Sequence, residues 1–108
     1  MGYRHGAHTV FEIHLHIVWT TKYRKPVMTG EVALRVREII RQACREVDTE
    51  IMKGHVSKDH VHVFVSIPPQ VTVSRLVQRL KGKSSHRLLA EFAHLRQTFW
   101  GRHLWARG

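Results

Sequence analysis

Acidic residues are scarce in this chain. Its 108 residues include 8 Asp and Glu against 18 Lys and Arg, which gives a formal net charge of +10. Such an excess of positive charge favours a polyanionic partner, most often a nucleic acid. The imbalance is strongest in the second half, because Glu91 is the only acid after His60 and is outnumbered by eight basic residues.

Cysteine and long apolar runs are also scarce. Cys44 is the only cysteine, so no disulfide can form within the chain, and this is typical of a reducing compartment. No apolar stretch approaches the roughly 20 residues of a membrane span, and residues 1–6 lack the apolar core of a signal peptide. We therefore expect a cytoplasmic protein with no membrane partner, folded as a single domain over residues 1–108.

The first half of the chain predicts a strand, a helix and a β-hairpin. Residues 9–22 alternate apolar and polar side chains as a strand does. Thr29 is a candidate N-cap for a helix over residues 31–47, whose apolar positions form one stripe. Two further strands, over residues 50–56 and 60–67, are separated by a three-residue loop and so predict an antiparallel hairpin.

The second half predicts one more helix and a final strand. Pro68 and Pro69 end the hairpin, and Thr72 can cap a helix that Gly82 weakens or kinks. The aromatic-rich residues 98–107 are typical of a last strand. The order β-α-β-β-α-β predicts an α+β, ferredoxin-like fold, in which one antiparallel sheet carries helices on one face and leaves the other uncovered.

His60 and His62 are the strongest candidates for chemistry. Successive side chains of a strand point to opposite faces, so these two imidazoles emerge on the same, uncovered face. Histidine is an ordinary surface residue as well as a metal ligand, but Asp59 before the pair and His55 across the hairpin favour a metal site. A third ligand must come from another residue, the substrate or water.

The same spacing recurs at His14 and His16 on the first predicted strand. Only Glu12 provides an acid beside them, so we expect structural roles, with His16 able to support the metal site.

The second predicted helix carries a basic stripe. Its cations recur at steps of about four residues and so share one face. Such a stripe is usually a solvated surface. Here only Arg87 has a carboxylate four residues away, so we expect the preceding cations to be unpaired and open to phosphates, helped by serine hydroxyls. The candidate DNA contacts on this helix are Arg75, Arg79, Lys81, Lys83, Ser84 and Arg87.

A second basic cluster ends the first predicted strand. Lys22, Tyr23 and Arg24 follow Trp19 and combine cations with an aromatic ring. This combination suits contacts to a nucleic-acid backbone and stacking on an unpaired base. Packing of the two aromatic rings in the core or at its rim is an equally open interpretation.

Four ordered blocks of the sequence resemble the HUH single-tyrosine transposases of the insertion-sequence 200-like family, a type that includes REP-associated tyrosine transposases. The blocks are HIVWTTKYRKPV (16–27), GHVSKDHVHV (54–63), VQRLKGKSS (77–85) and LWARG (104–108). Together they extend over nearly the whole chain.

The resemblance implies a metal-dependent enzyme that cuts and rejoins single-stranded DNA, recognised as an imperfect hairpin. His60 and His62 match the family's metal ligands, which hold magnesium or manganese against the scissile phosphate. A tyrosine hydroxyl attacks in family members and leaves a 5′-phosphotyrosine. The resemblance also implies a homodimer in which both subunits build each active site.

The nucleophile is the one departure that changes the functional prediction. In the family it lies on a further helix, beyond the strand that would end here at Gly108, so this catalytic helix is expected to be absent. The chain has two tyrosines, Tyr3 and Tyr23, and Tyr23 falls in a DNA-binding block. One alternative is an inactive DNA-binding remnant, or a regulator that dimerises with the intact enzyme. Others are a relaxase or replication-initiator domain, or an RNA-binding module, for which Phe64 alone on the His60 face is too few aromatics.

Overall fold

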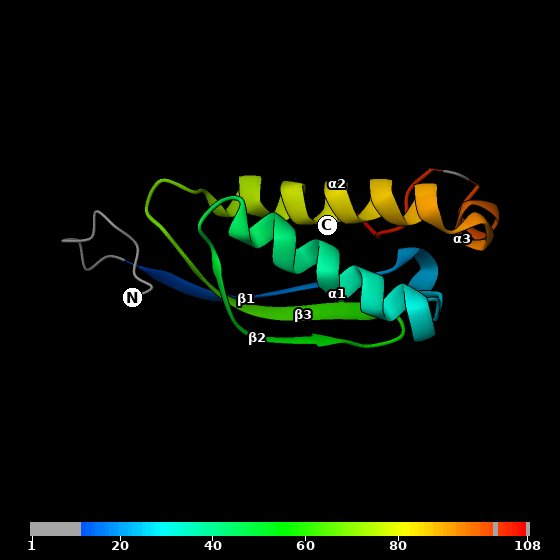
Figure 1. Ribbon diagram of the computed structural model, residues 1–108, viewed down its shortest axis with the longest axis horizontal. Helices are drawn as coiled ribbons and strands as arrows, with labels where there is room; N and C mark the ends of the chain where they lie inside the picture. Colours follow the sequence, from blue (N-terminus) through cyan, green and yellow to red (C-terminus); the bar gives the residue numbers. More distant parts are fainter. Residues whose placement is uncertain (1–11, 101, 108) are drawn as a thin grey trace.

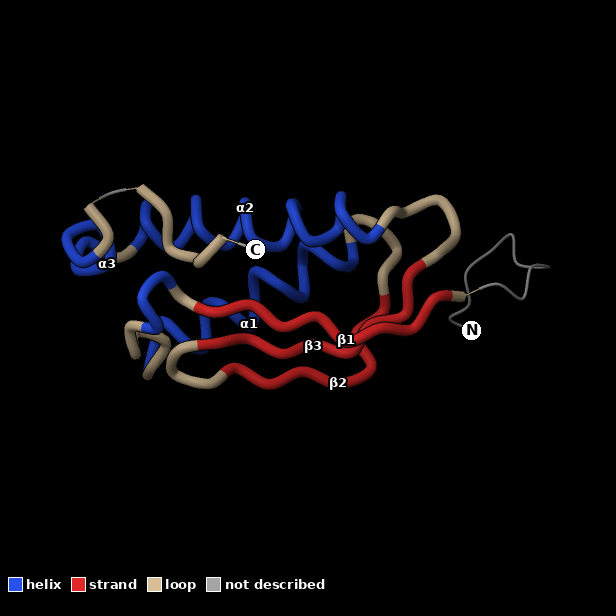
Figure 2. The backbone as a smooth tube through the Cα atoms, turned by 180° about the vertical axis from the view of Figure 1, so that it is seen from behind, coloured by secondary structure: helices blue, strands red, loops and turns tan. Residues whose placement is uncertain are grey.

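The computed structural model describes residues 12–100 and 102–107, and they form a sheet covered on one side by helices (Figure 1). The elements in chain order are β1 (Ile13–Thr20), the short 3-10 helix η1 (Lys22–Arg24), α1 (Gly30–Arg45), β2 (Glu50–Val56), β3 (His60–Ile67), α2 (Val73–Glu91) and α3 (Ala93–Thr98). Figure 2 shows from behind that the three strands lie in one layer and the long helices in another. The predicted α+β class, with helices on one face of an antiparallel sheet, is confirmed.

The sheet has the order β1-β3-β2, with β3 antiparallel to both neighbours. The predicted hairpin between β2 and β3 is confirmed, and its tight loop is closed by the Ser57 N–H, which donates to the His60 carbonyl at 2.8 Å. The register places Thr20 of β1 opposite His60, and His55 of β2 opposite His62. The ends of all three strands therefore meet around the histidine pair.

The core lies between the sheet and the two long helices. Alternation along β3 turns its apolar residues toward the helices, where they are buried: Val61, Val63, Val65 and Ile67. Leu76 and Leu80 of α2 are also buried, and burying each such side chain contributes roughly 1.5–3 kcal/mol. The side chains between them along β3, including the two histidines, consequently face away from the helices.

Helix α2 begins as predicted and continues past Gly82 to Glu91. Thr72 caps it, because its Oγ1 accepts a hydrogen bond from the Arg75 N–H at 3.2 Å. The helix runs without interruption from Val73 to Glu91, so the predicted kink at Gly82 is wrong. Packing of the apolar stripe against the core outweighs the low helix propensity of one glycine, about 1 kcal/mol. Thr29 does occupy the N-cap position of α1.

The predicted strand over residues 98–107 is wrong for the part that the structure describes. Thr98 is the last residue of α3, and the described residues after it form turns and irregular chain. The buried side chains of Phe99, Leu104 and Trp105 attach this segment to the core. Strand pairing is reduced to a single bridge between Thr21 and Trp105. Residues 9–11 of the first predicted strand lie outside the described residues, as does Tyr3.

Within the described residues, no helix is long and apolar enough to cross a membrane. The location in the cytoplasm stays a prediction.

Candidate metal pair and nucleic-acid interface

His60 and His62 lie on the uncovered face of the sheet, as predicted. Both side chains are half-buried, so they are accessible and are not sealed within the apolar core. Val61 and Val63 on either side of His62 are buried and hold β3 against the helices. A rigid strand therefore presents both imidazoles to the same side, beside His55 of the neighbouring strand.

His60 is oriented by a carboxylate. Its Nδ1 lies 2.9 Å from Oδ1 of Asp59, and Arg24 donates from Nε to Oδ2 of Asp59 at 3.1 Å. The hydrogen bond with His60, followed by that from Arg24, holds the pKa of Asp59 below its usual range. Carboxylates hold metal-binding histidines in the same way, by engaging one ring nitrogen and leaving the other for the metal.

His62 contacts a second histidine from β1. Its Nε2 lies 2.9 Å from Nδ1 of His16, and the His16 ring stacks on Phe64 with 4.5 Å between the ring centroids. A neutral imidazole has one donor and one acceptor nitrogen, so this contact requires complementary tautomers. His16 therefore lies in contact with His62, and its role in supporting a metal site stays a prediction.

These donors fit part of a metal site. Among the described residues, no group of three or more His, Cys, Asp or Glu side chains could hold a metal ion. The pair of imidazoles supplies two ligands, and magnesium or manganese commonly completes its coordination with water and phosphate oxygens. Two imidazoles would therefore leave the remaining coordination positions of such an ion to water or a phosphate.

The basic block after β1 is folded against the start of β3. Thr21 is buried, its N–H donates to the Asp59 carbonyl at 2.9 Å, and its Oγ1 donates to the Lys25 carbonyl at 2.8 Å. Tyr23 and Arg24 have positive φ angles of 59° and 54°, a conformation that turns the chain sharply and is uncommon outside glycine. The structure thus brings Lys22, Tyr23 and Arg24 beside His60.

A strongly basic groove of about 1160 Å³ lies between α2 and the segment that follows α3. We call it the C-terminal groove. Its charged lining residues are Lys22, Lys81, Arg96, Arg102 and Arg107, together with His86 and His103. None of its described lining residues is acidic. Lys81 donates to the Ala106 carbonyl at 2.8 Å, but a carbonyl is neutral, so the positive charge of the groove is not compensated there.

Sequence reasoning missed three of these cations, Arg96, Arg102 and Arg107. The excess of basic residues after His60 was the available signal. Their convergence on Lys22 depends on the bridge between Thr21 and Trp105, which joins segments more than 80 residues apart and is not visible in local sequence patterns.

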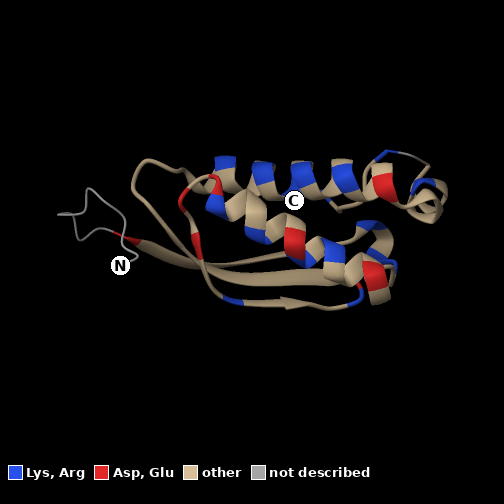
Figure 3. Cartoon of the chain, viewed as in Figure 1, with Lys and Arg blue, Asp and Glu red and all other residues tan. Residues whose placement is uncertain are grey.

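The basic stripe of α2 recurs at successive turns on the side of the helix away from the sheet (Figure 3). The prediction that its cations are unpaired is wrong for two of them. Arg79 and Lys83 both form ion pairs with Glu46, which follows α1, and the Lys83 Nζ lies 3.2 Å from Glu46 Oε1. The hydrogen bond from Lys83 is the largest cause that holds the pKa of Glu46 below its usual range. Glu91, expected beside Arg87, instead accepts two hydrogen bonds from Arg35.

Ser84 is not a surface residue, so its predicted phosphate contact is wrong. Its side chain is fully buried. Its hydroxyl donates to the Leu80 carbonyl at 2.5 Å and accepts from the Trp105 indole Nε1 at 2.9 Å. Ser84 therefore fastens the C-terminal segment to α2 and lies out of reach of a bound nucleic acid.

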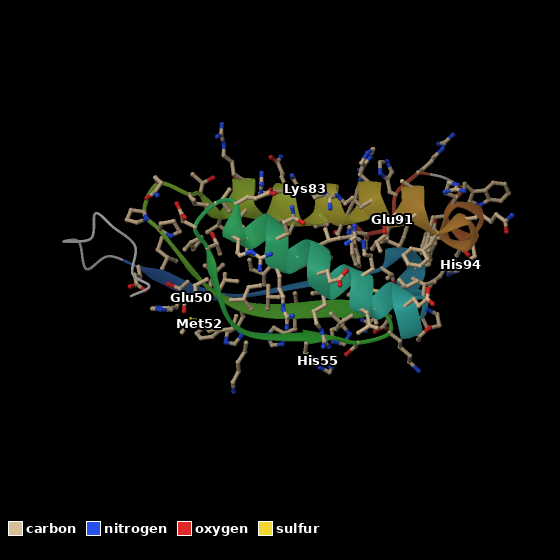
Figure 4. All side chains as sticks on the ribbon, viewed as in Figure 1. Glu50, Met52, His55, Lys83, Glu91 and His94 are labelled. Atoms are coloured by element: carbon tan, nitrogen blue, oxygen red, sulfur yellow. The ribbon has the colours of Figure 1, made fainter. Side chains whose placement is uncertain are left out.

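The candidate binding residues lie on two different sides of the molecule. Figure 4 shows His55 on the sheet side of the molecule and Lys83 on the helix side. The C-terminal groove and Arg24 connect to the histidine pair through Lys22 and Asp59, whereas Arg75, Arg79 and Lys83 line a separate groove of about 480 Å³. The predicted DNA contacts therefore divide between two surfaces.

Comparisons with known proteins identify relatives over nearly the whole chain. The family model described as "Transposase IS200 like" matches residues 9–108. The ISDra2 transposase TnpA of Deinococcus radiodurans is 34% identical over 100 residues, which is 93% of this chain and 71% of that protein. The transposase of insertion sequence IS200 from Salmonella typhimurium is 36% identical over 102 residues, 94% of this chain and 67% of that protein.

Two solved structures are similar in fold. A crystal structure of a candidate transposase from Deinococcus radiodurans R1 has a TM-score of 0.87 and 33% identity, over 98% of this chain and 82% of that chain. A REP-associated tyrosine transposase bound to a REP hairpin has a TM-score of 0.64 and 15% identity, over 88% of this chain and 52% of that chain. The second likeness concerns the fold alone.

Proposed function

This chain belongs to the family of IS200-like transposases, and from that premise we propose that it binds hairpin DNA with a single-stranded flank as the metal-dependent core of a transposase. The observation that supports this most is the position of the basic turn between the groove and the histidine pair. Lys22 lines the C-terminal groove, Arg24 two residues further on binds Asp59, and Asp59 binds His60. A strand lying in the groove would therefore be led to the histidine pair.

We propose that the C-terminal groove binds the phosphate backbone of the DNA. Its cations face no acidic lining residue among the described ones, so a polyanion would gain from releasing its counterions there. One relative in fold was solved with a REP hairpin bound, which supports a hairpin as the form of the DNA. A second surface for phosphates is formed by Arg75, Arg79 and Lys83. It should bind phosphates more weakly, because Arg79 and Lys83 are paired with Glu46.

His60 and His62 hold the divalent metal in the proposal. A bound magnesium or manganese ion would supply charge neutralisation at the scissile phosphate. Asp59 fixes the His60 ring through Nδ1, and His16 supports His62. Arg24, bound to Asp59, keeps the basic turn next to this pair.

A homodimer is the expected assembly. In the part of the chain that the structure describes, β1 and β2 form the two edges of the sheet. An edge strand has N–H and C=O groups available for pairing with another chain. Sedimentation equilibrium at micromolar concentrations would measure the mass of this assembly.

The tyrosine content supports a second candidate function, DNA binding without strand cleavage. The 108 residues contain Tyr3 and Tyr23. Tyr23 lies in the basic turn beside Arg24, where it suits contact with DNA. In this reading the chain would act as a binding module or a regulator that dimerises with an intact enzyme.

Covalent capture of DNA separates the two functions. We predict that the 108-residue protein, incubated with manganese and a tailed hairpin, forms no adduct resistant to denaturing electrophoresis, because Tyr23 matches a DNA-binding block of the family and Tyr3 lies outside all four matching blocks. An adduct that disappears in Tyr23→Phe or Tyr3→Phe would contradict this and assign the nucleophile to that residue.

The proposed DNA surface is tested by the salt dependence of binding to a tailed hairpin, measured by fluorescence anisotropy. Arg102→Gln and Lys22→Gln should each lower the slope of log K against log salt by about 0.7–0.9, the value for one phosphate contact. Arg79→Gln should lower it by less, because Glu46 competes for that guanidinium.

Arg41→Gln is the matched control, since Arg41 is an exposed cation of α1 that lines none of these grooves. It should leave the slope unchanged. Equal effects of Arg41→Gln and Arg102→Gln would mean that overall charge, and not the C-terminal groove, binds the DNA.

A further inference from the structure

Two aromatic side chains, Tyr23 and Trp100, are exposed close to one another at one end of the molecule. Trp100 is 87% exposed and Tyr23 is 77% exposed, whereas Trp19 and Trp105 are buried and contact each other edge to face. Large aromatic rings are usually buried, so their exposure in one place indicates a binding surface.

The two rings line one groove of about 490 Å³, although their positions are 77 residues apart in sequence. We call it the aromatic groove. Its lining includes Lys22, Tyr23, Lys25, Phe99, Trp100 and Arg102. Lys22 and Arg102 also line the C-terminal groove, so the two grooves adjoin and a single ligand can extend from one to the other.

The backbone presents both rings outward. Tyr23 and Trp100 have φ angles of 59° and 56°, a region that side-chain-bearing residues rarely adopt and that costs of order 1 kcal/mol or more. Neighbouring residues fix both turns: Thr21 is buried and hydrogen-bonded at one, and Phe99 is buried at the other. Strained backbone that the surrounding structure maintains is common at ligand-binding sites.

The chemistry of the groove indicates the ligand. An aromatic face offers stacking to a nucleic-acid base, and the Lys22 Nζ lies 5.6 Å from the Tyr23 ring centroid. Lys25 and Arg102 supply charge for phosphates on either side. An apolar protein segment would bury these cations without compensation. A base within a duplex is already stacked, so the base that binds here must be unpaired.

We propose that the aromatic groove binds an unpaired base of the single strand that flanks a DNA hairpin, stacked on Trp100 or Tyr23, while the hairpin's phosphates lie in the adjoining C-terminal groove. This inference rests on the proposed function and deepens it by assigning the recognition of the single-stranded flank to Trp100, which no sequence pattern identified.

The test compares two DNAs, a blunt hairpin and the same hairpin with a short single-stranded flank. Trp100→Ala should weaken binding of the flanked hairpin by about 5- to 100-fold, the effect of removing one stacked base, and leave the blunt hairpin unaffected. Trp100→Phe should restore most of the loss, because phenylalanine keeps an aromatic face. An abasic flank should bind wild type and Trp100→Ala equally.

Tryptophan fluorescence gives an independent measurement. The flanked hairpin should quench wild-type emission, since Trp100 is exposed and the other two tryptophans are buried. The blunt hairpin should quench less, and Trp100→Phe should remove the difference. Val73→Ala is the control, because Val73 is an exposed apolar residue at the opposite end of α2, and it should behave as wild type.

Equal affinity of wild type and Trp100→Ala for the flanked hairpin would overturn this inference and leave the proposed function intact. Equal losses on both DNAs would also overturn it, because Trp100 would then act on the duplex. Failure of the wild-type protein to bind either DNA would overturn the proposed function itself, and this inference with it.

Discussion

At the scale of single residues, Asp59 connects the metal pair to the DNA surface. One of its carboxylate oxygens contacts His60 and the other accepts from Arg24. Its main-chain carbonyl accepts from Thr21. A change at Asp59 should therefore affect both the orientation of the His60 ring and the position of the basic turn.

Manganese binding tests the metal pair. Calorimetric titration should detect binding to wild type and none to His60→Ala or His62→Ala, because two ligands are the minimum on which the site depends. Asp59→Asn should weaken binding by about 10- to 100-fold, the usual cost of removing a carboxylate that orients a ligand.

His14→Ala provides the matched control for this titration. His14 is exposed on the same strand face but pairs with Ser66, at the far end of β1 from His60. It should bind manganese as wild type does. Wild-type manganese affinity in His62→Ala would show that His60 and His62 do not bind the metal as a pair.

Residue-scale predictions from sequence were right where only strand alternation mattered, and wrong where distant segments meet. His60 and His62 share a face because neighbours of a residue point the other way. Ser84 was assigned to the surface because the contact of its hydroxyl with Trp105 cannot be read from local spacing. Trp100 was assigned to a strand, and its exposure follows from a turn that only the packing of Phe99 reveals.

At the scale of elements, α1 and α2 are joined by side-chain pairs at both ends of their contact. Arg35 of α1 donates from Nε and Nη2 to the two carboxylate oxygens of Glu91, at 2.7 and 2.9 Å. Near the other end of α1, Glu46 binds Arg79 and Lys83 of α2. These pairs fix how the two helices lie across the sheet, and they are invisible to sequence rules that compare residues four apart.

The Arg35–Glu91 pair should make stability depend on pH. Hydrogen bonds from Arg35 are the largest cause that lowers the pKa of Glu91, with the charge of Arg87 adding to them. A lowered folded-state pKa contributes stability above the unfolded value of about 4.3, and this is lost as the pH falls through the folded-state value. Glu91→Gln should therefore lower the free energy of unfolding at pH 7, by less than about 1 kcal/mol because the pair is partly exposed.

Urea denaturation at pH 7 and near pH 3 measures this effect. Wild type and Glu91→Gln should differ at the higher pH and converge at the lower one. A double-mutant cycle with Arg35→Gln isolates the pair from other effects of each substitution. A coupling energy of zero at pH 7 would show that the pair contributes nothing to stability.

Element-scale prediction was right for the parts with long, regular patterns. Helix α1, the β2–β3 hairpin and the start of α2 follow from apolar spacing and the Thr72 cap. The last predicted strand was wrong because Phe99 and Trp105 suit a strand by composition, yet they are buried in the core from a segment of turns that follows α3. Residue type alone does not distinguish a strand from an irregular segment whose aromatic side chains pack in the core.

At the scale of the whole molecule, the arrangement places chemistry at one end of the sheet. The ends of the three strands, the basic turn and the C-terminal segment meet there (Figure 1). The stripe of α2 lies on the helix side of the molecule (Figure 3), whereas His60 and His62 alternate with the buried valines of β3 and face away from the helices. The C-terminal groove includes Lys22 of the basic turn, whereas Arg75, Arg79 and Lys83 line a separate groove. A DNA molecule that reaches the metal pair is therefore expected to approach past Lys22 and not along those three cations.

The central claim is that a DNA strand bound in the C-terminal groove reaches the histidine pair. Metal-directed cleavage of the bound DNA is the most direct test of this claim. Ferrous iron, bound in place of manganese and activated with ascorbate, produces radicals that cut only nearby nucleotides. Cuts should be confined to a few nucleotides of the single-stranded flank in wild type, abolished in His62→Ala and dispersed in Arg102→Gln. Cutting that is spread evenly over the hairpin, or that is unchanged in His62→Ala, would contradict it.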